Sequence, residues 1–293
     1  MIFGVLGALG IFVLGFSGYF ISDLLARRNN LEEETNFAAA AGFGFLVNFL
    51  DTLGIGSFAP LTALLRGFKQ IQDRVIPGTL NVSCTLPVAA EAFIFITVIE
   101  VDAATLIVMI AAAVCGAVVG AGMVAGMPEK KIRLIMGLAL LTTAFLMFSG
   151  QMGWIAGLGR GEAIGLRGPR LLIAVMVNFF LGAFNAAGIG LYAPCMALVY
   201  ILGMSPRVAF PIMMGSAAFL MPPASIRFIK AGAYNRKASL AITTTGIVGV
   251  MIAAFIVKSL PLTTLTWLVI AVIVYTAAAL LLSAFSSNHG GRT

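Results

Sequence analysis

Apolar residues in this chain fall in blocks of about 18 to 27, long enough for helices that cross a hydrocarbon core of ~30 Å. Of the 293 residues, 60% are apolar and 10% are charged, and the mean hydropathy is +1.06. A water-soluble domain carries about 25% charged residues. The sequence therefore predicts an all-α polytopic membrane protein.

Eleven helical segments are expected from this pattern. They cover residues 2–25, 37–53, 57–68, 77–100, 103–126, 132–151, 171–187, 191–203, 208–229, 238–258 and 262–284. Segments 57–68 and 191–203 are too short to cross a bilayer, because twelve residues rise only about 18 Å. Each short segment follows a glycine-rich break. Residues 37–68 and 171–203 are therefore each expected to form a re-entrant hairpin.

The same helix-breaking phrase occurs twice. Residues 51–64 read DTLGIGSFAPLTAL, and residues 185–198, at an offset of 134, read NAAGIGLYAPCMAL. The similarity continues from DRVIP (73–77) to PRVAFP (206–211), and from LP (86–87) to MP (221–222). The helix-breaking residues are Gly54, Gly56, Pro60 and Pro87 in the first half, and Gly188, Gly190, Pro194 and Pro222 in the second.

Five segments per repeat, an odd number, invert the second copy relative to the first. The predicted organisation is an N-terminal helix and loop (1–36), a first repeat (37–152), an extracytoplasmic loop (153–170), an inverted second repeat (171–285) and a disordered tail (286–293). Inverted repeats with broken helices are typical of secondary transporters, with the substrate bound near the bilayer midplane. The alternative is that Gly and Pro only permit kinks and close packing.

The net charge of +7 does not indicate a nucleic-acid partner, because the basic residues lie in short gaps without interleaved aromatics. In a membrane protein such charges set orientation. Arg27 and Arg28 follow the first apolar block, and alternation from there places thirteen of the eighteen basic residues on their side. We therefore expect the N-terminus outside and the C-terminus in the cytoplasm.

Helices that begin inside a membrane present unpaired N–H groups and a positive dipole end, which bind anions. The helices after Gly56 and Gly190, and the pieces expected to restart after Pro87 and Pro222, would do so. The candidate substrate-binding side chains near them are Ser57, Thr79, Asn81, Ser83, Thr85, Asn185, Tyr192 and Ser216. Alternatively, the Ser and Thr hydroxyls bond back to the preceding helical turn.

Four charged residues are further candidates. Arg74 and Arg207 each begin a helix, where a cation opposes the dipole, so they either attract the anion or form structural ion pairs. Asp51 and Glu91 are the acids expected deepest in the membrane, and they are candidates for proton coupling. Asp51 could instead pair with an Arg or cap the following helix. Glu32, Glu33 and Glu34 are interpreted as a solvated start of the 37–53 helix.

No enzymatic motif is present: the chain lacks a GxxxxGK[ST] loop, HExxH and GxSxG. Cys84, Cys115 and Cys195 lie in apolar blocks without CxxC or a neighbouring His, which disfavours metal sites and disulfides. No cofactor is expected, and we do not expect an enzyme.

DTLGIGSF (51–58), followed by DRVIPGTLN (73–81) and Pro87, resembles the sulfite exporter TauE/SafE family over roughly residues 37–284. The resemblance implies a secondary carrier, in the plasma (inner) membrane, for sulfite, organosulfonates or related anions, in some members linked to protons. The second half keeps GIG, Arg207, Pro211 and Pro222 but has no acid equivalent to Asp51 or Glu91.

The leading hypothesis is a secondary transporter that moves a small sulfur-containing anion by alternating access. A carrier for another small anion such as a carboxylate, an anion channel, and a non-transporting membrane scaffold are the alternatives. The partners expected are the anion and the lipid bilayer, with a homodimer left open. The sequence also leaves open the substrate, the transport direction and the coupling ion.

Overall fold

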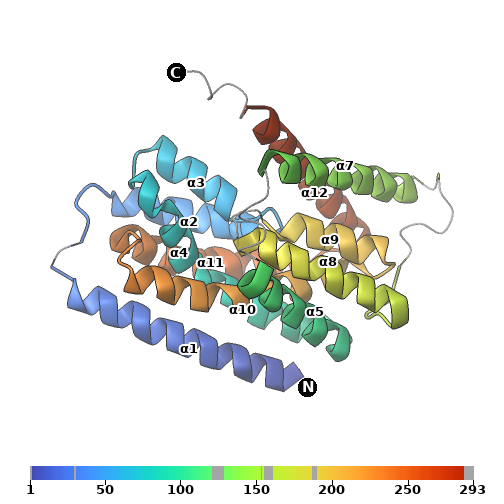
Figure 1. Cartoon of the computed structure of the whole chain (residues 1–293), viewed down its shortest axis with the longest axis horizontal. Helices are drawn as coiled ribbons and strands as arrows, with labels where there is room; N and C mark the ends of the chain where they lie inside the picture. Colours follow the sequence, from blue (N-terminus) through green and yellow to red (C-terminus); the bar gives the residue numbers. More distant parts are fainter. Residues whose placement is uncertain are drawn as a thin grey trace. The chain divides into compact units, whose positions relative to one another are not determined.

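A computed structural model describes residues 2–29, 31–120, 129–152, 154, 161–186 and 190–286. In these ranges the chain forms eleven α-helices and no strand (Figure 1). They are α1 (Ile2–Ala26), α2 (Phe37–Thr52), α3 (Phe58–Gly67), α4 (Ile76–Val98), α5 (Ala103–Cys115), α7 (Glu129–Gln151), α8 (Gly168–Ala186), α9 (Tyr192–Ile201), α10 (Ala209–Lys230), α11 (Arg236–Ser259) and α12 (Leu262–Ser286).

Three shorter turns of helix complete the order: a 3-10 turn η1 (Asp73–Val75), a π-helical segment η2 (Gly116–Gly120) that continues α5, and a 3-10 turn η3 (Pro206–Val208). All eleven predicted helices are confirmed, and ten have both ends within three residues of the prediction. Some of the predicted positions lie outside the described residues. They are residues 121–126 of the predicted 103–126 helix, residues 153 and 155–160 of the predicted loop, Gly188, and residues 287–293 of the predicted tail.

Seven of the described helices are long and apolar enough to cross a membrane. They cover Ile2–Ala26, Ile76–Val98, Arg133–Gln151, Gly168–Asn185, Pro206–Lys230, Arg236–Val257 and Thr263–Phe285. The protein is therefore a multi-pass membrane protein. The two short helices α3 and α9 have 10 residues each, which is about 15 Å at 1.5 Å per residue and too short to span.

The expected restarts after Pro87 and Pro222 are wrong, because α4 and α10 run continuously through these prolines. A proline in a helix removes the donor to the carbonyl four residues earlier. For Pro87 that carbonyl belongs to Ser83, and it accepts a hydrogen bond of 2.8 Å from the Thr243 hydroxyl of α11. A replacement donor keeps α4 continuous, so no free helix N-terminus arises at Pro87.

The chain divides into two compact units, and neither follows the order of the sequence repeat. Unit 1 comprises residues 1–98 and 214–259, and unit 2 comprises residues 99–213 and 260–293. Unit 1 thus joins α2, α3 and α4 of the first repeat to α11 of the second. Unit 2 joins α8, α9 and α12 of the second repeat to α5 and α7 of the first.

In unit 1, α2 and α11 approach through three glycines. A Cβ added to Gly44 would lie 2.5 Å from the Ile242 Cα, and one added to Gly246 would lie 2.6 Å from the Asn48 Nδ2. A Cβ on Gly249 would lie 2.5 Å from the Phe45 carbonyl oxygen. Small residues let membrane helices pack backbone to backbone, so these glycines fix the spacing of α2 and α11.

Unit 2 has the same kind of contact between α5 and α8. A Cβ on Gly116 or on Gly182 would lie less than 3.0 Å from the carbonyl oxygen of Phe179 or Ala113 respectively, too close for a side chain. Phe45 and Phe179 are 134 residues apart, and Gly116 and Gly249 are 133 apart. The α2–α11 and α5–α8 contacts are therefore made by corresponding positions of the two repeats.

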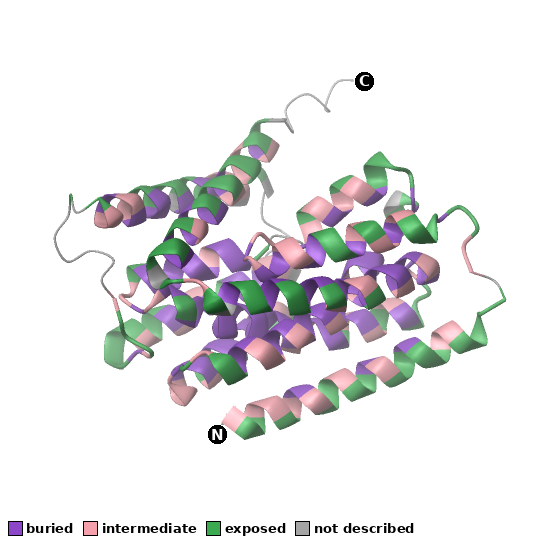
Figure 2. Cartoon of the chain, turned by 180° about the vertical axis from the view of Figure 1, so that it is seen from behind, coloured by how far each residue is buried: buried purple, intermediate pink, exposed green. Residues whose placement is uncertain are grey.

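Helix α1 packs on unit 1 with few of its residues. Its buried residues are Leu9, Phe16 and Phe20, and the last two join Val82, Ile229 and Tyr234 in an apolar cluster. The rest of α1, next to the N-terminus in Figure 2, is exposed or only half-buried along its length. Exposed apolar residues such as Phe3, Ile11 and Leu14 suit a helix that faces lipid.

Candidate functional site

The break between α2 and α3 places polar groups at the end of α2. Gly54 and Gly56 have φ angles of 96° and 88°, a left-handed conformation that favours glycine. The Gly54 N–H bonds to the Asp51 carbonyl at 2.7 Å, which closes α2. Ser57 then stands at the N-cap of α3, and its hydroxyl does not cap the helix. The GIG phrase thus stops one helix and starts another within a few residues.

Asp51 lies at the centre of a buried polar cluster in unit 1. Its exposed fraction is 1%, and its Oδ2 atom has no hydrogen-bond partner within the described residues. The hydroxyl and backbone N–H of Ser57 lie beside its carboxyl group. Cys84 of α4 is the nearest thiol: its neighbours are Asp51 and Ser57, and its sulfur lies 3.7 Å from the Ser83 hydroxyl. The cluster brings together the predicted candidates Asp51, Ser57 and Ser83.

Glu91 belongs to the same cluster. It is fully buried in α4, and its Oε1 accepts a hydrogen bond of 2.7 Å from the Thr52 hydroxyl. The Thr52 oxygen also lies 2.9 Å from the Asn48 carbonyl oxygen. One hydroxyl carries one hydrogen, so both contacts are satisfied together when Glu91 is protonated and donates to Thr52. The Glu91 carboxyl group, Thr52 and the Asn48 carbonyl therefore form one hydrogen-bonded chain.

Thr85 and Asn81 occupy neighbouring turns of α4. The Thr85 oxygen lies 2.8 Å from the Ser225 oxygen of α10 and also donates to the Asn81 carbonyl. The Asn81 amide donates back to the Pro77 carbonyl at 2.9 Å, the local bond expected for a polar side chain in a helix. Asn81 is only half-buried, so the structure does not join it to the Asp51 cluster.

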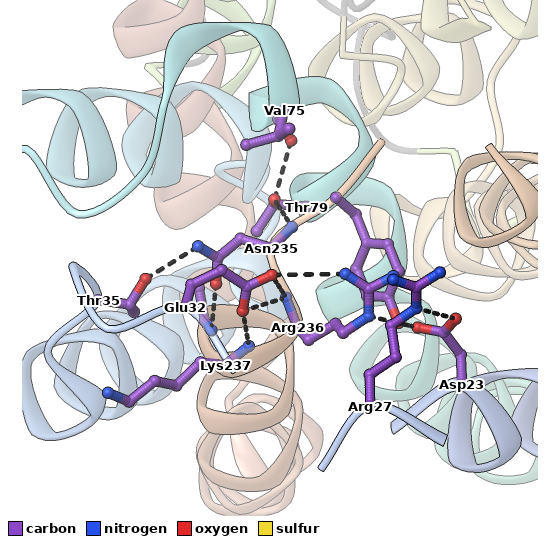
Figure 3. Close-up of polar contacts among 11 residues, drawn as sticks. Asp23, Arg27, Glu32, Thr35, Val75, Thr79, Asn235, Arg236 and Lys237 are labelled. Carbon is purple, nitrogen blue, oxygen red and sulfur yellow. Dashed lines mark hydrogen bonds and ion pairs between the residues drawn. The ribbon is translucent and has the colours of Figure 1, made fainter. Parts of the chain in front are cut away.

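Thr79 lies outside the Asp51 cluster and links two helices. Its hydroxyl donates to the Val75 carbonyl at 2.8 Å and accepts the Asn235 N–H at 2.9 Å, which ties α4 to the start of α11 (Figure 3). Arg74 is exposed, and its Nε donates to the Gln72 side chain. Neither residue forms part of the buried cluster of unit 1.

The second-repeat candidates within the described residues lie in unit 2, except Ser216 and Pro222. Arg207 in η3 is exposed and donates to the Leu260 carbonyl at 2.8 Å. Tyr192 is buried at the start of α9, and Asn185 is half-buried in the last turn of α8. Gly190 precedes α9 and is exposed. Ser216 is buried in the part of α10 that belongs to unit 1.

A polar network at the start of α11 was missed by sequence reasoning. Figure 3 shows Asp23 and Arg236 facing each other, and Asp23 Oδ2 accepts from Arg236 Nε at 2.6 Å and from the Tyr234 hydroxyl at 2.7 Å. Burial raises the pKa of Tyr234, and this hydrogen bond raises it further. The interpretation of Glu32 is wrong: its carboxylate accepts the Arg236 and Lys237 N–H groups, so it caps α11.

Residues 4–147 match the family model described as Sulfite exporter TauE/SafE. These residues, slightly less than half of the chain, are therefore similar to this family. No curated protein and no solved structure matches. The TauE/SafE match includes α1, which the expected resemblance over 37–284 left out, and it ends within α7, so it contains the whole Asp51 cluster and none of α8 to α12.

Proposed function

We propose that this protein is a secondary transporter of a small sulfur-containing oxyanion, such as sulfite or an organosulfonate, working by alternating access. The observation that carries the proposal is the broken helix pair α2–α3, whose break lies beside the buried Asp51 cluster. Irregular backbone is tolerated at membrane depth only where it is buried in protein or lines a watery cavity. The TauE/SafE family match supports an anion as the substrate.

The N-terminus of α3 supplies donors for an oxyanion. Phe58 and Ala59 are the first residues of the helix, where N–H groups have no intrahelical acceptor, and Pro60 has no N–H. The Ser57 hydroxyl lies beside the Asp51 carboxyl group, and it would become a third donor by turning toward the anion. A sulfite or sulfonate group accepts several such bonds at once, and helix dipoles hold its charge without a fixed cation. A site of this kind can release the anion as well as bind it.

Asp51 would couple protons to the anion. An ionised carboxylate beside the α3 N-terminus repels an oxyanion, whereas a protonated carboxyl group donates a hydrogen bond to it. Oδ2, which has no partner within the described residues, is then the donor. Glu91 and Thr52 provide a second proton position in the same cluster. Anion binding and protonation of the cluster would therefore favour each other.

The equivalent packing in the two units supports an inverted repeat. Corresponding positions form the α2–α11 and α5–α8 contacts, and corresponding residues cap α5 and α11: Asp102 accepts the Thr105 N–H at 2.9 Å, and Asn235 accepts the Ala238 N–H at 2.8 Å. In alternating access, two bodies of a transporter move against each other around the substrate site, and such bodies often have equivalent internal packing. We further propose that the N-terminus faces outward and the C-terminus faces the cytoplasm of a plasma (inner) membrane.

Flux into proteoliposomes tests the function. Labelled sulfite, taurine or a small carboxylate is offered with and without a pH gradient. We expect saturable uptake of a sulfur oxyanion that responds to the gradient, loss of that response in Asp51→Asn, and reduced uptake in Ser57→Ala. Glu34→Gln, which removes an exposed acid, is the control and should transport normally. Uptake of carboxylates only, unitary currents, or unchanged flux in both cluster variants would each contradict the proposal.

Labelling from each side of the membrane tests the inverted repeat. Single cysteines at Glu162 and Gly232, in a chain with the native cysteines replaced, should react from opposite faces of oriented vesicles. Reactivity of both from the same face would make the repeats parallel.

A further inference from the structure

A cavity of about 380 Å³ lies in unit 1, away from the Asp51 cluster. The last two turns of α1 form one wall, and the α10–α11 turn forms the other. Its lining residues are Tyr19, Ser22, Asp23, Ala26, Arg27, Ile229, Lys230, Ala231, Gly232 and Arg236.

The cavity is located where three spans end. The candidate spans Ile2–Ala26 and Pro206–Lys230 finish at it, and the span Arg236–Val257 begins at it. The cavity therefore opens at the boundary between the hydrocarbon core and water. A ligand there meets polar groups on the water side and helix surfaces on the lipid side.

The lining carries an excess of positive charge. It contains the cations Arg27, Lys230 and Arg236 and the single acid Asp23. Asp23 is bound by Arg236 and Tyr234, and Glu32 lies 3.6 Å from the Arg236 Nη1. With both acids counted against the three cations, one positive charge remains, which would neutralise the single negative charge of a phosphodiester.

Lys230 and Arg27 are the cations available to a ligand. The Lys230 ammonium lies 5.0 Å from the centre of the Tyr19 ring, and no carboxylate of the described chain lies within salt-bridge distance of it. Arg27 lies 3.9 Å from Asp23, and its side chain is 61% exposed. Ser22 adds a hydroxyl group to the lining.

Apolar surface continues from the cavity along α1. Tyr19, Ile21 and Leu25 are 47%, 54% and 63% exposed. Most residues of this helix are exposed or half-buried (Figure 2). A ligand with a phosphate head and an acyl tail fits both surfaces, whereas free phosphate fits only the head.

We propose that this cavity binds the headgroup of an anionic phospholipid, with the phosphate between Arg27 and Lys230. Basic pockets between membrane helices are suited to such headgroups, and each Lys or Arg near the surface contributes to their attraction. The tyrosine–lysine pair at the interface also orients the helix end. The lipid would hold α1 against the α10–α11 turn.

Native mass spectrometry and thermal unfolding in neutral detergent test the proposal. Phosphatidylglycerol and phosphatidylcholine with the same acyl chains are titrated into the purified full-length protein. We expect phosphatidylglycerol to bind more tightly and to raise the unfolding midpoint more. In Arg27→Gln/Lys230→Gln this preference should fall roughly tenfold. Arg236 stays unchanged, because its loss would leave Asp23 without its bound cation.

Arg28→Gln is the control. It removes one positive charge directly after Arg27, where the side chain does not line the cavity, and it should keep the lipid preference. Equal binding of both lipids, or the same loss in Arg28→Gln and the double variant, would overturn the proposal. Equal stabilisation by glycerol 3-phosphate at millimolar concentration would show a site for free phosphate and also overturn it. Sulfite or taurine flux in detergent-free vesicles of phosphatidylcholine tests the transport function separately.

Discussion

Gly116 packs against the carbonyl oxygen of Phe179 with no room for a side chain between η2 and α8. Gly249 packs in the same way against Phe45, between α11 and α2. The two glycines are 133 residues apart and the two phenylalanines 134 apart, close to the offset of the repeated phrase, so the two units contain the same kind of helix crossing.

Substituting either glycine should destabilise its unit. Gly116→Ala and Gly249→Ala each push a methyl group into a backbone carbonyl, which cannot move aside as a side chain can. Overpacking of this kind costs about 1–3 kcal/mol. The midpoint of thermal unfolding in detergent should fall for both. Gly42→Ala in α2 is the control, because an added Cβ there meets nothing within 4 Å. Its unfolding midpoint should not fall. An equal fall of the midpoint in all three variants would contradict the close-packing argument.

Thr243 should stabilise the protein through the Ser83 carbonyl that Pro87 leaves without its helical donor. Thr243→Val keeps the shape and removes the donor, which should cost about 0.5–2 kcal/mol in free energy of unfolding. Thr244→Val is the control, because the Thr244 hydroxyl bonds only within its own helical turn. Unfolding in mixed micelles should give a lower free energy of unfolding for Thr243→Val than for Thr244→Val. This difference should vanish when Pro87→Ala is also present, because the alanine restores the helical N–H donor.

Helix positions could be predicted from the sequence, because apolar blocks and breaks by Gly and Pro are local signals. The break at Gly54 and Gly56 is an example: both glycines have the left-handed φ that the phrase predicts. Pro87 shows the limit, since the helix continues through it and the Ser83 carbonyl takes its donor from Thr243, far away in sequence.

The exchange of α5 and α11 between units could not be predicted from the repeat phrase. The interface positions differ in identity: Gly44 corresponds to Asn178, and Asn48 to Gly182. In unit 1 Gly44 meets Ile242, and in unit 2 the Asn178 amide donates to the Met109 carbonyl at 2.7 Å. A glycine and an asparagine make equivalent contacts with no sequence similarity to show it.

The candidate site was predicted in part. Asp51, Glu91, Ser57 and Ser83 lie in the buried cluster of unit 1, as polar residues beside a broken helix should. Thr79 and Arg207 instead bond to distant segments, which no local pattern indicates, and Arg74 bonds to the nearby Gln72 side chain. The role of Glu32 depends on the fold that brings α11 beside it, so no local pattern could indicate it.

Asp102 should make stability depend on pH in the acidic range. The Thr105 backbone N–H, together with the Thr105 hydroxyl and Arg167, lowers the pKa of Asp102. A carboxyl group with a lowered pKa stabilises the fold above its unfolded pKa of about 3.9. This contribution is lost as pH falls through the folded pKa. The difference in unfolding midpoint between wild type and Asp102→Asn should therefore shrink from pH 6 to pH 3.

The Arg167→Gln variant separates the cap from the ion pair at Asp102. Arg167 is 78% exposed and lies 3.0 Å from the carboxylate, and exposed pairs contribute about 0–1 kcal/mol. We expect this variant to keep most of the pH dependence. A complete loss in Arg167→Gln would assign the effect to the ion pair instead of the Thr105 bonds.

Thr52 and Glu91 should be energetically coupled, because they form a buried hydrogen bond of 2.7 Å between α2 and α4. In a double-mutant cycle of Thr52→Val and Glu91→Gln, the free energies of unfolding should deviate from additivity by about 0.5 kcal/mol or more. Thr97→Val lies on the same helix as Glu91, but its hydroxyl bonds only to the Phe93 carbonyl, so its cycle with Glu91→Gln should be additive. If the Thr52 cycle is additive as well, the two side chains do not interact in the membrane-embedded protein, and Glu91 has no proton path through Thr52.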